Sequence, residues 1–211
     1  MIDKRPAAIV RVSQVADVLS TVNFARDHEL DLAIRGGGHS APGFGTCDDG
    51  IVIDFANRTG VHVGPATGTA RLEPGATWAD FNRAAHAFGP ATTGGIIGST
   101  GVAGLTLGGG IGYLARKHGL SCDNLILADV VTADEGFLKA SATENEDLFW
   151  ALRGGGGNFG VVKAMRTGIL NFAQGVYSAI RNPCYSLHIG IGTPRGVGTV
   201  GHLEHSGSMG G

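Results

Sequence analysis

Apolar and polar positions along the first 162 residues predict short strands separated by turns and short helices. Runs rich in β-branched and other apolar residues, bounded by Gly, Pro, Asp or Asn, are typical of strands. The expected strands are Ala8–Val12, Asp31–Arg35, Ile51–Asp54, Val61–Val63, Thr69–Leu72, Leu125–Thr132 and Phe137–Ala140. The fourth and fifth strands form a hairpin pair, and residues 133–136 turn the sixth strand into the seventh.

Apolar residues recur at helical spacing in three further segments. The expected helices are a segment capped by Ser13 that holds Val15, Val18, Leu19 and Val22, then Thr77–Ala87, then Glu146–Arg153. Thr77 and Asp80 form a start that resembles a capping box. Because the strands and helices do not alternate regularly, the pattern favours an α+β fold over a doubly wound sheet.

Glycine is the unusual component of the composition, with 37 residues in 211 against a usual share of about 7%. The glycines cluster in three places: Gly36–Gly38, Gly94–Gly112 and Gly154–Gly160. Successive main-chain N–H groups in such loops bind anions without Lys or Arg, so three loops on one domain would wrap a long dinucleotide. The alternative interpretation is that each cluster is only a tight turn.

A Rossmann nucleotide site is the first hypothesis to weigh for these loops. Residues Gly36–Ala41 fit G-x-G-x-x-A after a strand, but Pro42 and nearby glycines remove the helix that the fingerprint needs. Gly155–Gly160 fits G-x-G-x-x-G but follows a helix. A nicotinamide-binding Rossmann protein is therefore the weaker alternative, and the P-loop and the hydrolase elbow are absent from the sequence.

Charge and cysteine content exclude several classes of partner. The formal net charge of −2 gives no reason to expect nucleic acid or an anionic membrane as a partner. The three cysteines are far apart, which argues against a disulfide framework or a metal site. We see no signal peptide and no apolar stretch of about 18 residues, so we expect a cytoplasmic protein without a membrane span.

Four runs carry a family resemblance. Arg35-Gly-Gly-Gly-His-Ser40 resembles the signature of FAD-linked oxidases with a PCMH-type FAD-binding domain, most closely the berberine-bridge-enzyme-like members of the vanillyl-alcohol oxidase superfamily. Thr100–Gly112, Tyr113–Asn124 and Asp147–Val162 are similar to the family's later motifs and stand in the family's order. Together they cover residues 5 to 162, which makes them far more specific than one glycine motif.

The resemblance implies two α+β subdomains with FAD between them, formed by residues 1–170, followed by an atypical Gly/Ser-rich tail at 171–211 that we expect to be poorly ordered. It implies that the loop Gly36–Ser40 lies near the pyrophosphate. The cofactor-binding residues carried over are Arg35, Gly36, Gly37, Gly38, His39, Ser40, Gly98, Ser99, Thr100, Gly101, Val102, Gly104, Leu105, Gly108, Gly109, Gly110, Gly112, Asp123, Asn124, Val131, Asn158, Gly160 and Val161. For Arg35, an ordinary charge at a strand end is an equal alternative.

The resemblance also implies a covalent bond from His39 to the 8α-methyl group of the flavin. Without the motif, a histidine after a glycine turn is better interpreted as a solvated or hydrogen-bonded side chain. Some relatives have a second, cysteinyl bond at a position that falls here at about Ile97, so we expect linkage through His39 only. Cys122 is interpreted as a buried small hydrophobe, whereas Cys47, near the His39 loop, is the less certain case.

The implied activity is that of an oxidase, in which hydride passes from a small organic substrate to flavin N5 and O2 reoxidises the flavin. The family's substrate domain, with its catalytic residues, has no counterpart after Lys163 in the sequence, so no general base is named. The substrate stays open, and we expect the chain to be a fragment at both ends. The alternative is a catalytically incomplete flavin-binding remnant whose apolar partner surface is exposed.

Overall fold

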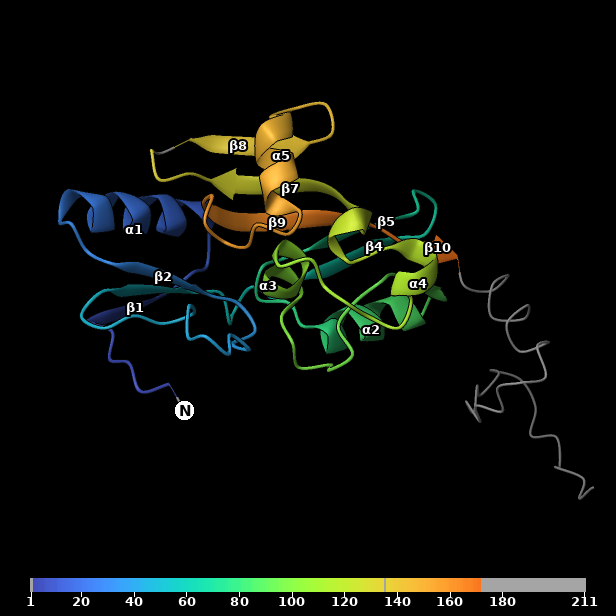
Figure 1. The fold of residues 1–211 in the computed structure, drawn as a ribbon, viewed down its shortest axis with the longest axis horizontal. Helices are drawn as coiled ribbons and strands as arrows, with labels where there is room; N and C mark the ends of the chain where they lie inside the picture. Colours follow the sequence, from blue (N-terminus) through green and yellow to red (C-terminus); the bar gives the residue numbers. More distant parts are fainter. Residues whose placement is uncertain (1, 135, 172–211) are drawn as a thin grey trace, which may run out of the picture.

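The computed structural model describes residues 2–134 and 136–171, which form two α+β subdomains (Figure 1). The first is a parallel three-stranded sheet in the order β1-β3-β2 with one helix. β3 pairs with both neighbours, so that Ile51 lies opposite Ala8 on one side and Leu32 on the other. This central place explains why β3 is buried along its whole length. The elements are β1 (Ala8–Arg11), α1 (Val15–Asp27), β2 (Leu32–Arg35) and β3 (Ile51–Asp54).

The second subdomain is built on an antiparallel five-stranded sheet in the order β4-β5-β9-β7-β8. Its strands are β4 (Val61–Gly64), β5 (Thr69–Leu72), β7 (Leu125–Val131), β8 (Phe137–Ser141) and β9 (Val161–Gly168). β9 is the last of the five in sequence and lies in the middle, between β5 and β7, so it closes the sheet. A separate short pair joins β6 (Pro90–Ala91) to β10 (Leu170–Asn171).

Helices cover the inner face of the five-stranded sheet, which we define as the face that carries Leu72, Val130 and Met165. The helical elements are α2 (Trp78–His86), α3 (Val102–Leu107), α4 (Ala115–His118), the 3-10 turn η1 (Cys122–Asn124) and α5 (Glu146–Leu152). Apolar side chains of α2, α3 and α5 form one buried cluster with this face. Burial of that cluster holds the second subdomain together.

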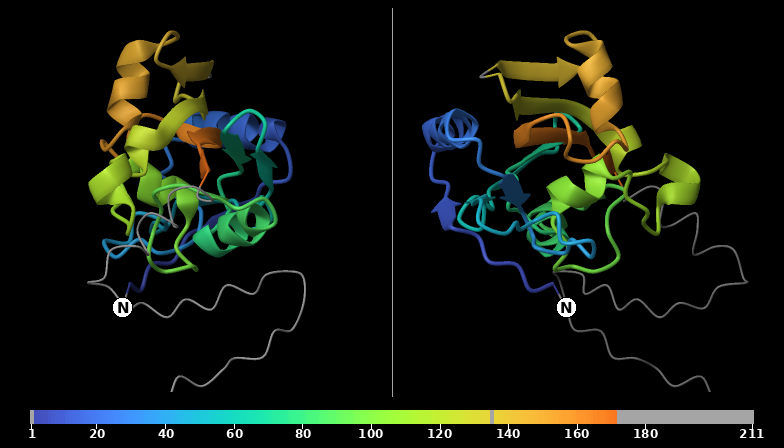
Figure 2. Two further views of the ribbon diagram at one scale, coloured as in Figure 1. Left: turned by 90° about the vertical axis from the view of Figure 1, so that its right-hand side faces the viewer. Right: turned by 60° about the vertical axis from the view of Figure 1, so that its left-hand side comes forward.

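Helix α1 covers one end of the opposite, outer face of the same sheet. Its Val18 and Val22 share a buried cluster with Val131 and Val161, the pair at the end of β7 and the start of β9. In both views of Figure 2, α1 and α5 lie apart with β9 between them. Helix α1 therefore forms one junction between the two subdomains, while much of the outer face has no helix of the described residues on it.

The sequence prediction placed the ends of the strands and of the second and third helices to within one residue. The capping box of Thr77 and Asp80 is confirmed. The Ser13 cap is wrong: Gln14 is the N-cap residue, and the Ser13 N–H and hydroxyl instead donate to Asp17. The α+β class is confirmed, and no helix follows Gly38 as a Rossmann fold would require.

Six elements were not predicted: β6, α3 inside the glycine-rich passage, the short α4, η1, and the strands β9 and β10 near the end of the described chain. Apart from Asn171, the tail expected at 171–211 lies outside the described residues. Across residues 2–134 and 136–171, no helix is both long and apolar enough to cross a membrane.

Candidate functional site: two glycine loops and His39

Two glycine loops that are far apart in sequence meet backbone to backbone. A Cβ built on Gly37 would lie 2.4 Å from the main-chain N of Gly101, and a Cβ on Gly101 would lie 2.6 Å from the N of Gly37. The first loop follows β2 directly, and Gly101 is the N-cap residue of α3. Glycine at both positions is what allows this approach. The structure thus joins the first two predicted flavin motifs.

The main-chain N–H groups of residues 36 to 40 donate no hydrogen bond to any described part of the chain. The same holds for the N–H groups of Gly98, Ser99 and Gly101 on the facing loop. Main-chain donors of this kind are normally paired, and clusters of unpaired donors bind anions. The donor set fits a diphosphate group without needing a Lys or Arg.

Arg35 braces the first loop. Its guanidinium donates to the buried Asp54 carboxylate at 3.2 Å and would lie 3.3 Å from a Cβ on Gly38. Gly38 has φ 75°, in the left-handed region that favours glycine. A buried carboxylate needs a paired charge, so Arg35 both neutralises Asp54 and lies against the turn.

His39 lies where the two loops meet, exposed and held by two hydroxyl groups. Its Nε2 is 3.0 Å from Ser99 Oγ, and its Nδ1 is 3.5 Å from Thr100 Oγ1. Ile97 stands in the same turn, since its carbonyl accepts from the Thr100 N–H, and its side chain is 58% exposed. The His39 ring and residue 97 therefore belong to one rim of the site.

The segment Gly108–Gly112 passes close to its neighbours and takes backbone angles that favour glycine. Gly109 and Gly110 have φ 102° and 81°, and a Cβ on Gly112 would lie 2.0 Å from the Gly94 carbonyl oxygen. The N–H of Ser121 donates to the Gly110 carbonyl, which ties this segment to the turn before η1. This segment therefore contains both tight turns and a close contact between two stretches of main chain.

Several predicted site residues serve the structure itself. Asp123 accepts from the Leu120 N–H and pairs with Arg153, while the Asn124 amide donates to the carbonyls of His118 and Leu120. The remaining members lie apart from the His39 rim: Val131 and Val161 are buried under α1, Gly160 packs on the Val131 carbonyl, and Asn158 donates to Gly155. Their part in cofactor binding stays a prediction.

Neither described cysteine is presented to the site. Cys122 is buried, and burial, helped by the Asp123 carboxylate, raises the pKa of its thiol. Cys47 is buried with Ala33 and Val52. The reading of Cys122 as a small buried hydrophobe is confirmed, and Cys47 behaves alike. Within residues 2–134 and 136–171, no group of three or more His, Cys, Asp or Glu could hold a metal ion.

The sequence analysis missed a hollow of about 280 Å³ beside the second loop, lined by Trp78, Thr92, Gly95 and Tyr113 among others. The Trp78 indole N–H and the Thr92 hydroxyl are buried without a hydrogen-bond partner. No charged side chain lines it. The sequence signal that could have predicted this hollow is the presence of hydroxyl-bearing residues directly before a glycine cluster. Polar atoms without partners suit a neutral polar group or water.

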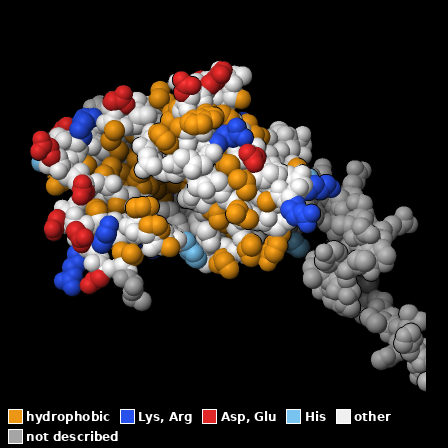
Figure 3. Space-filling model, viewed as in Figure 1, with side chains coloured by type: hydrophobic (Ala, Val, Ile, Leu, Met, Phe, Trp, Pro, Cys, Tyr) orange, Lys and Arg blue, Asp and Glu red, His pale blue; other side chains and the backbone are white. Residues whose placement is uncertain are grey.

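Apolar side chains are exposed around this site. Phe44, Ile111, Tyr113 and Trp150 are each more than 70% exposed. In the view of Figure 3, apolar patches lie across the middle of the molecule, with most charged side chains toward its margins. Exposed apolar surface of this extent marks a site that another molecule covers.

Comparison with known proteins supports the same assignment. The family described as FAD binding domain matches residues 6–141. The (R)-6-hydroxynicotine oxidase of Paenarthrobacter nicotinovorans is 40% identical over 159 residues, which is 75% of this chain but 35% of that enzyme. The FAD-linked oxidoreductase YgaK of Bacillus subtilis is 37% identical over 169 residues, covering 78% of this chain and 38% of the relative. The chain thus spans little more than a third of these curated relatives.

Solved structures agree with the sequence matches. The crystal structure of 6-hydroxy-D-nicotine oxidase from Arthrobacter nicotinovorans superposes with a TM-score of 0.78 at 38% identity, covering 80% of this chain and 37% of that one. A glucooligosaccharide oxidase from Acremonium strictum, described with 6-S-cysteinyl, 8α-N1-histidyl FAD, superposes with a TM-score of 0.75 at 35% identity, covering 80% and 36%. The chain therefore belongs to the FAD-linked oxidases with a PCMH-type FAD-binding domain, in the berberine-bridge-enzyme-like branch of the vanillyl-alcohol oxidase superfamily.

Proposed function

We propose that this domain holds FAD with the diphosphate on the main-chain N–H groups of the two joined glycine loops. The observation that carries the proposal is the backbone contact of Gly37 with Gly101, which brings together eight N–H groups without partners. Preformed donors stabilise an anion without having to reorganise. The cradle comprises Arg35, Gly36, Gly37, Gly38, Ser40, Gly98, Ser99, Gly101, Gly104 and Gly108, with Asp123, Asn124 and Asn158 bracing the surrounding turns.

We propose a covalent bond between a ring nitrogen of His39 and the 8α-methyl carbon of the flavin. The hydroxyls of Ser99 and Thr100 fix the ring at the rim of the cradle, where a bound cofactor and the imidazole would be held together. Such proximity supplies a large effective concentration of one reactant at the other. The bond through His39 is the only one proposed, because Ile97 has no nucleophilic atom.

The activity proposed for the whole protein is oxidation of a small organic substrate. Bound flavin supplies the redox chemistry, taking hydride from a substrate C–H at N5 and passing the electrons to O2. Residues of this chain hold and orient the cofactor, and the nearby neutral hollow at Trp78 and Thr92 suits an uncharged polar substrate group. The names of the similar oxidases refer to nicotine derivatives and oligosaccharides.

A second candidate is a flavin-binding fragment without catalysis. It concerns the 211 residues by themselves, which span about 35% of the length of these relatives. The exposed apolar face around Tyr113 and Trp150 suits a domain whose cover comes from another part of a longer protein. In that case FAD would still stabilise the fold by mass action, with no turnover.

Acid precipitation tests the covalent proposal directly. The 211-residue chain is expressed, denatured in acid, and the pellet is examined for flavin absorbance, beside His39→Ala and a Cys122→Ser control. We expect flavin in the wild-type and control pellets and none with His39→Ala. Peptide mass mapping should then find flavin on the peptide that contains residue 39 alone. A flavin-bearing peptide that contains residue 97, or a colourless wild-type pellet, would contradict the single-bond proposal.

Non-covalent binding is measured separately. Calorimetry on purified His39→Ala should show that FAD still binds, because the N–H groups of the cradle are intact. If His39→Ala binds FAD tightly but without a covalent bond, the N–H groups bind the cofactor independently of the bond to His39. If His39→Ala is folded and binds no FAD at all, the cradle proposal is wrong.

A further inference from the structure

The His39 ring has two hydroxyl neighbours, and they do not hold it equally. Ser99 Oγ lies 3.0 Å from Nε2, within the usual range for a hydrogen bond to a ring nitrogen. Thr100 Oγ1 lies 3.5 Å from Nδ1, whereas such bonds are normally no longer than about 3.2 Å. Nε2 is therefore the engaged nitrogen, and Nδ1 has only a weak competitor for its place.

The main chain fixes the turn that carries Ser99. The Gly98 carbonyl accepts from the Ala79 N–H at 2.8 Å, and the Thr100 carbonyl accepts from the Trp78 N–H at 3.0 Å. Both donors lie at the start of α2. Although its side chain is exposed, Ser99 is thus anchored on both sides. An anchored hydroxyl can orient the ring without having to be ordered first.

The hydrogen bond at one ring nitrogen decides the state of the other. A neutral imidazole has one N–H and one free lone pair. If Ser99 donated to Nε2, the proton would be on Nδ1, and neither nitrogen would offer a free lone pair. If Ser99 instead accepts from Nε2–H, the lone pair of Nδ1 is available. Only the second arrangement lets the ring form a new bond while it keeps its contact with Ser99.

We propose that Ser99 is a positioning residue for covalent attachment of the cofactor: its hydroxyl accepts from the Nε2–H of His39 and so leaves Nδ1 as the nucleophile. This inference rests on the proposed bond to His39, and it adds the atom that forms the bond and the residue that prepares that atom. Orientation of a nucleophile through a third group is a general device of covalent catalysis.

The same hydrogen bond also suits the ring after the bond has formed. The Nδ1 lone pair makes the bond to the 8α carbon as one methyl proton leaves, and the electron pair of the broken C–H bond passes to the flavin ring and from there to O2. The alkylated imidazole is positively charged while Nε2 keeps its proton. A charged donor makes a stronger hydrogen bond, so the Ser99 hydroxyl stabilises the ring more as the reaction proceeds.

The rate of flavin attachment is the first test. The 211-residue chain is produced without flavin in a host that requires added riboflavin, mixed with FAD, and sampled by acid precipitation. Ser99→Ala should attach flavin about tenfold more slowly than wild type, because a hydrogen bond to a group that becomes charged is lost. Ser99→Thr keeps a hydroxyl and should restore most of the rate. In the His39→Ala background, Ser99→Ala should leave the Kd for FAD unchanged, since the main-chain N–H is retained.

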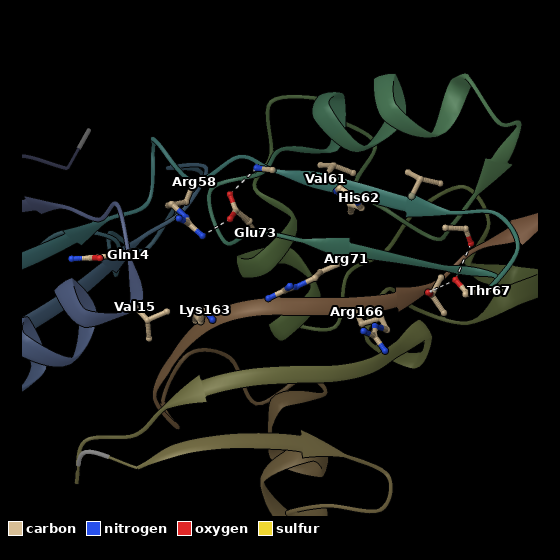
Figure 4. A pocket seen from close by; sticks show the side chains of 14 residues that line it. Gln14, Val15, Arg58, Val61, His62, Thr67, Arg71, Glu73, Lys163 and Arg166 are labelled. Carbon is tan, nitrogen blue, oxygen red and sulfur yellow. Dashed lines mark hydrogen bonds and ion pairs between the residues drawn. The ribbon is translucent and has the colours of Figure 1, made fainter.

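The matched control removes a hydroxyl outside both glycine loops. Thr67 Oγ1, in the turn between β4 and β5, lies 2.9 Å from Thr69 Oγ1 and lines a groove of about 810 Å³ (Figure 4). The same groove is lined by an outer-face row of basic residues, His62, Arg71 and Arg166, on β4, β5 and β9. None of its lining residues belongs to the two loops. Thr67→Val should therefore attach flavin at the wild-type rate.

The tautomer of His39 is measured without any cofactor. Two-bond ¹H–¹⁵N correlation spectra of histidine-labelled, FAD-free protein at alkaline pH separate the Nε2–H and Nδ1–H forms, and His39→Ala identifies the His39 signals. We expect the Nε2–H form alone in wild type and a mixture of both forms in Ser99→Ala. If the chain binds FAD but never attaches it, the covalent bond itself is contradicted, and these spectra still decide the role of Ser99.

Four results would overturn the role of Ser99. The first is the Nδ1–H form in wild type, and the second is attachment by Ser99→Ala at the wild-type rate. The third is a rate that falls with Thr100→Val but not with Ser99→Ala, which would make Thr100 the positioning residue. The fourth is a weaker Kd for FAD in Ser99→Ala that accounts for all of its slower attachment, which would make the hydroxyl a ligand of the cofactor. Thermal melts verify that each variant is folded.

Discussion

Gly37→Ala tests the joint between the two loops, on which the proposed cradle depends. The new Cβ would lie 2.4 Å from the N and 2.5 Å from the Cα of Gly101, and both contacts are with main chain, which cannot rotate away. The loops would have to part by about 1 Å to restore an ordinary contact. Overpacking of this kind costs about 1–3 kcal/mol, equivalent to about 2–12 °C in Tm for a domain of this size.

FAD affinity should fall further than stability alone explains, because the unpaired N–H groups of residues 36–40 would move away from those of residues 98, 99 and 101. Displacement of binding groups by about 1 Å is enough for a large loss, about tenfold or more in Kd. The assay is calorimetric titration of FAD into Gly37→Ala in the His39→Ala background, beside thermal melts. Gly157→Ala is the control, since a Cβ there meets nothing within 4 Å and its φ is ordinary. If Gly37→Ala lowers Tm but leaves FAD affinity unchanged, the contact between the two loops is not the diphosphate site.

Three further predictions concern single residues. Arg166→Glu should place a carboxylate opposite Arg71, raising the free energy of unfolding by about 0.2–1 kcal/mol and Tm by about 1–3 °C, with the gain lost in high salt. The Ser13 and Gln14 N–H groups donate to Asp17 and lower its pKa from 3.8 to about 2. The ionised carboxylate therefore stabilises the folded state above pH 3.8, and this stabilisation is lost as pH falls toward 2. The Tm gap between wild type and Asp17→Asn should therefore be open near neutral pH and close on acidification, and a gap independent of pH would contradict this. Gly104→Ala should raise the Tm of the FAD-free domain, because alanine favours the helix and a Cβ there meets nothing within 4 Å, but should weaken FAD binding.

Local chemistry explains which elements the sequence could predict. The apolar runs of β3 and β7 and the Thr77–Asp80 box of α2 are complete within a few residues, so their patterns identify them. β9 contains Lys163, Thr167 and Gly168, and its place depends on pairing with β5 and β7, which are distant in sequence. Non-local pairing of this kind leaves only a weak local signal. α3 was missed because Gly104 and the flanking glycines mask a short helix that is held by burial of Val102 and Leu107.

The candidate site was predictable as a set of motifs but not as an arrangement. The packing of α3 brings Gly101 against Gly37. It also brings the hydroxyls of Ser99 and Thr100 to the His39 ring. No spacing of residues in the sequence predicts these contacts. Asp123 and Asn124 illustrate the opposite case. Their motif predicted cofactor contacts, and the structure shows that Asp123 also pairs with Arg153 and the Leu120 N–H, while the Asn124 amide donates to the Leu120 carbonyl. The outer-face row of basic residues was invisible in the sequence because its members come from three separate strands.

The glycines of the site serve two purposes, and the structure separates them. At Gly36, Gly37, Gly101 and Gly112 a Cβ would lie within 3.0 Å of the protein's own main chain, so glycine is required there with or without a cofactor. Gly104 and Gly108 are different, because a Cβ meets nothing within 4 Å at the first and nothing closer than 3.5 Å at the second. The fold itself tolerates alanine at these two positions. A loss of FAD affinity on substituting them would therefore report close approach of the cofactor, which substitution of the other four cannot distinguish from damage to the loops.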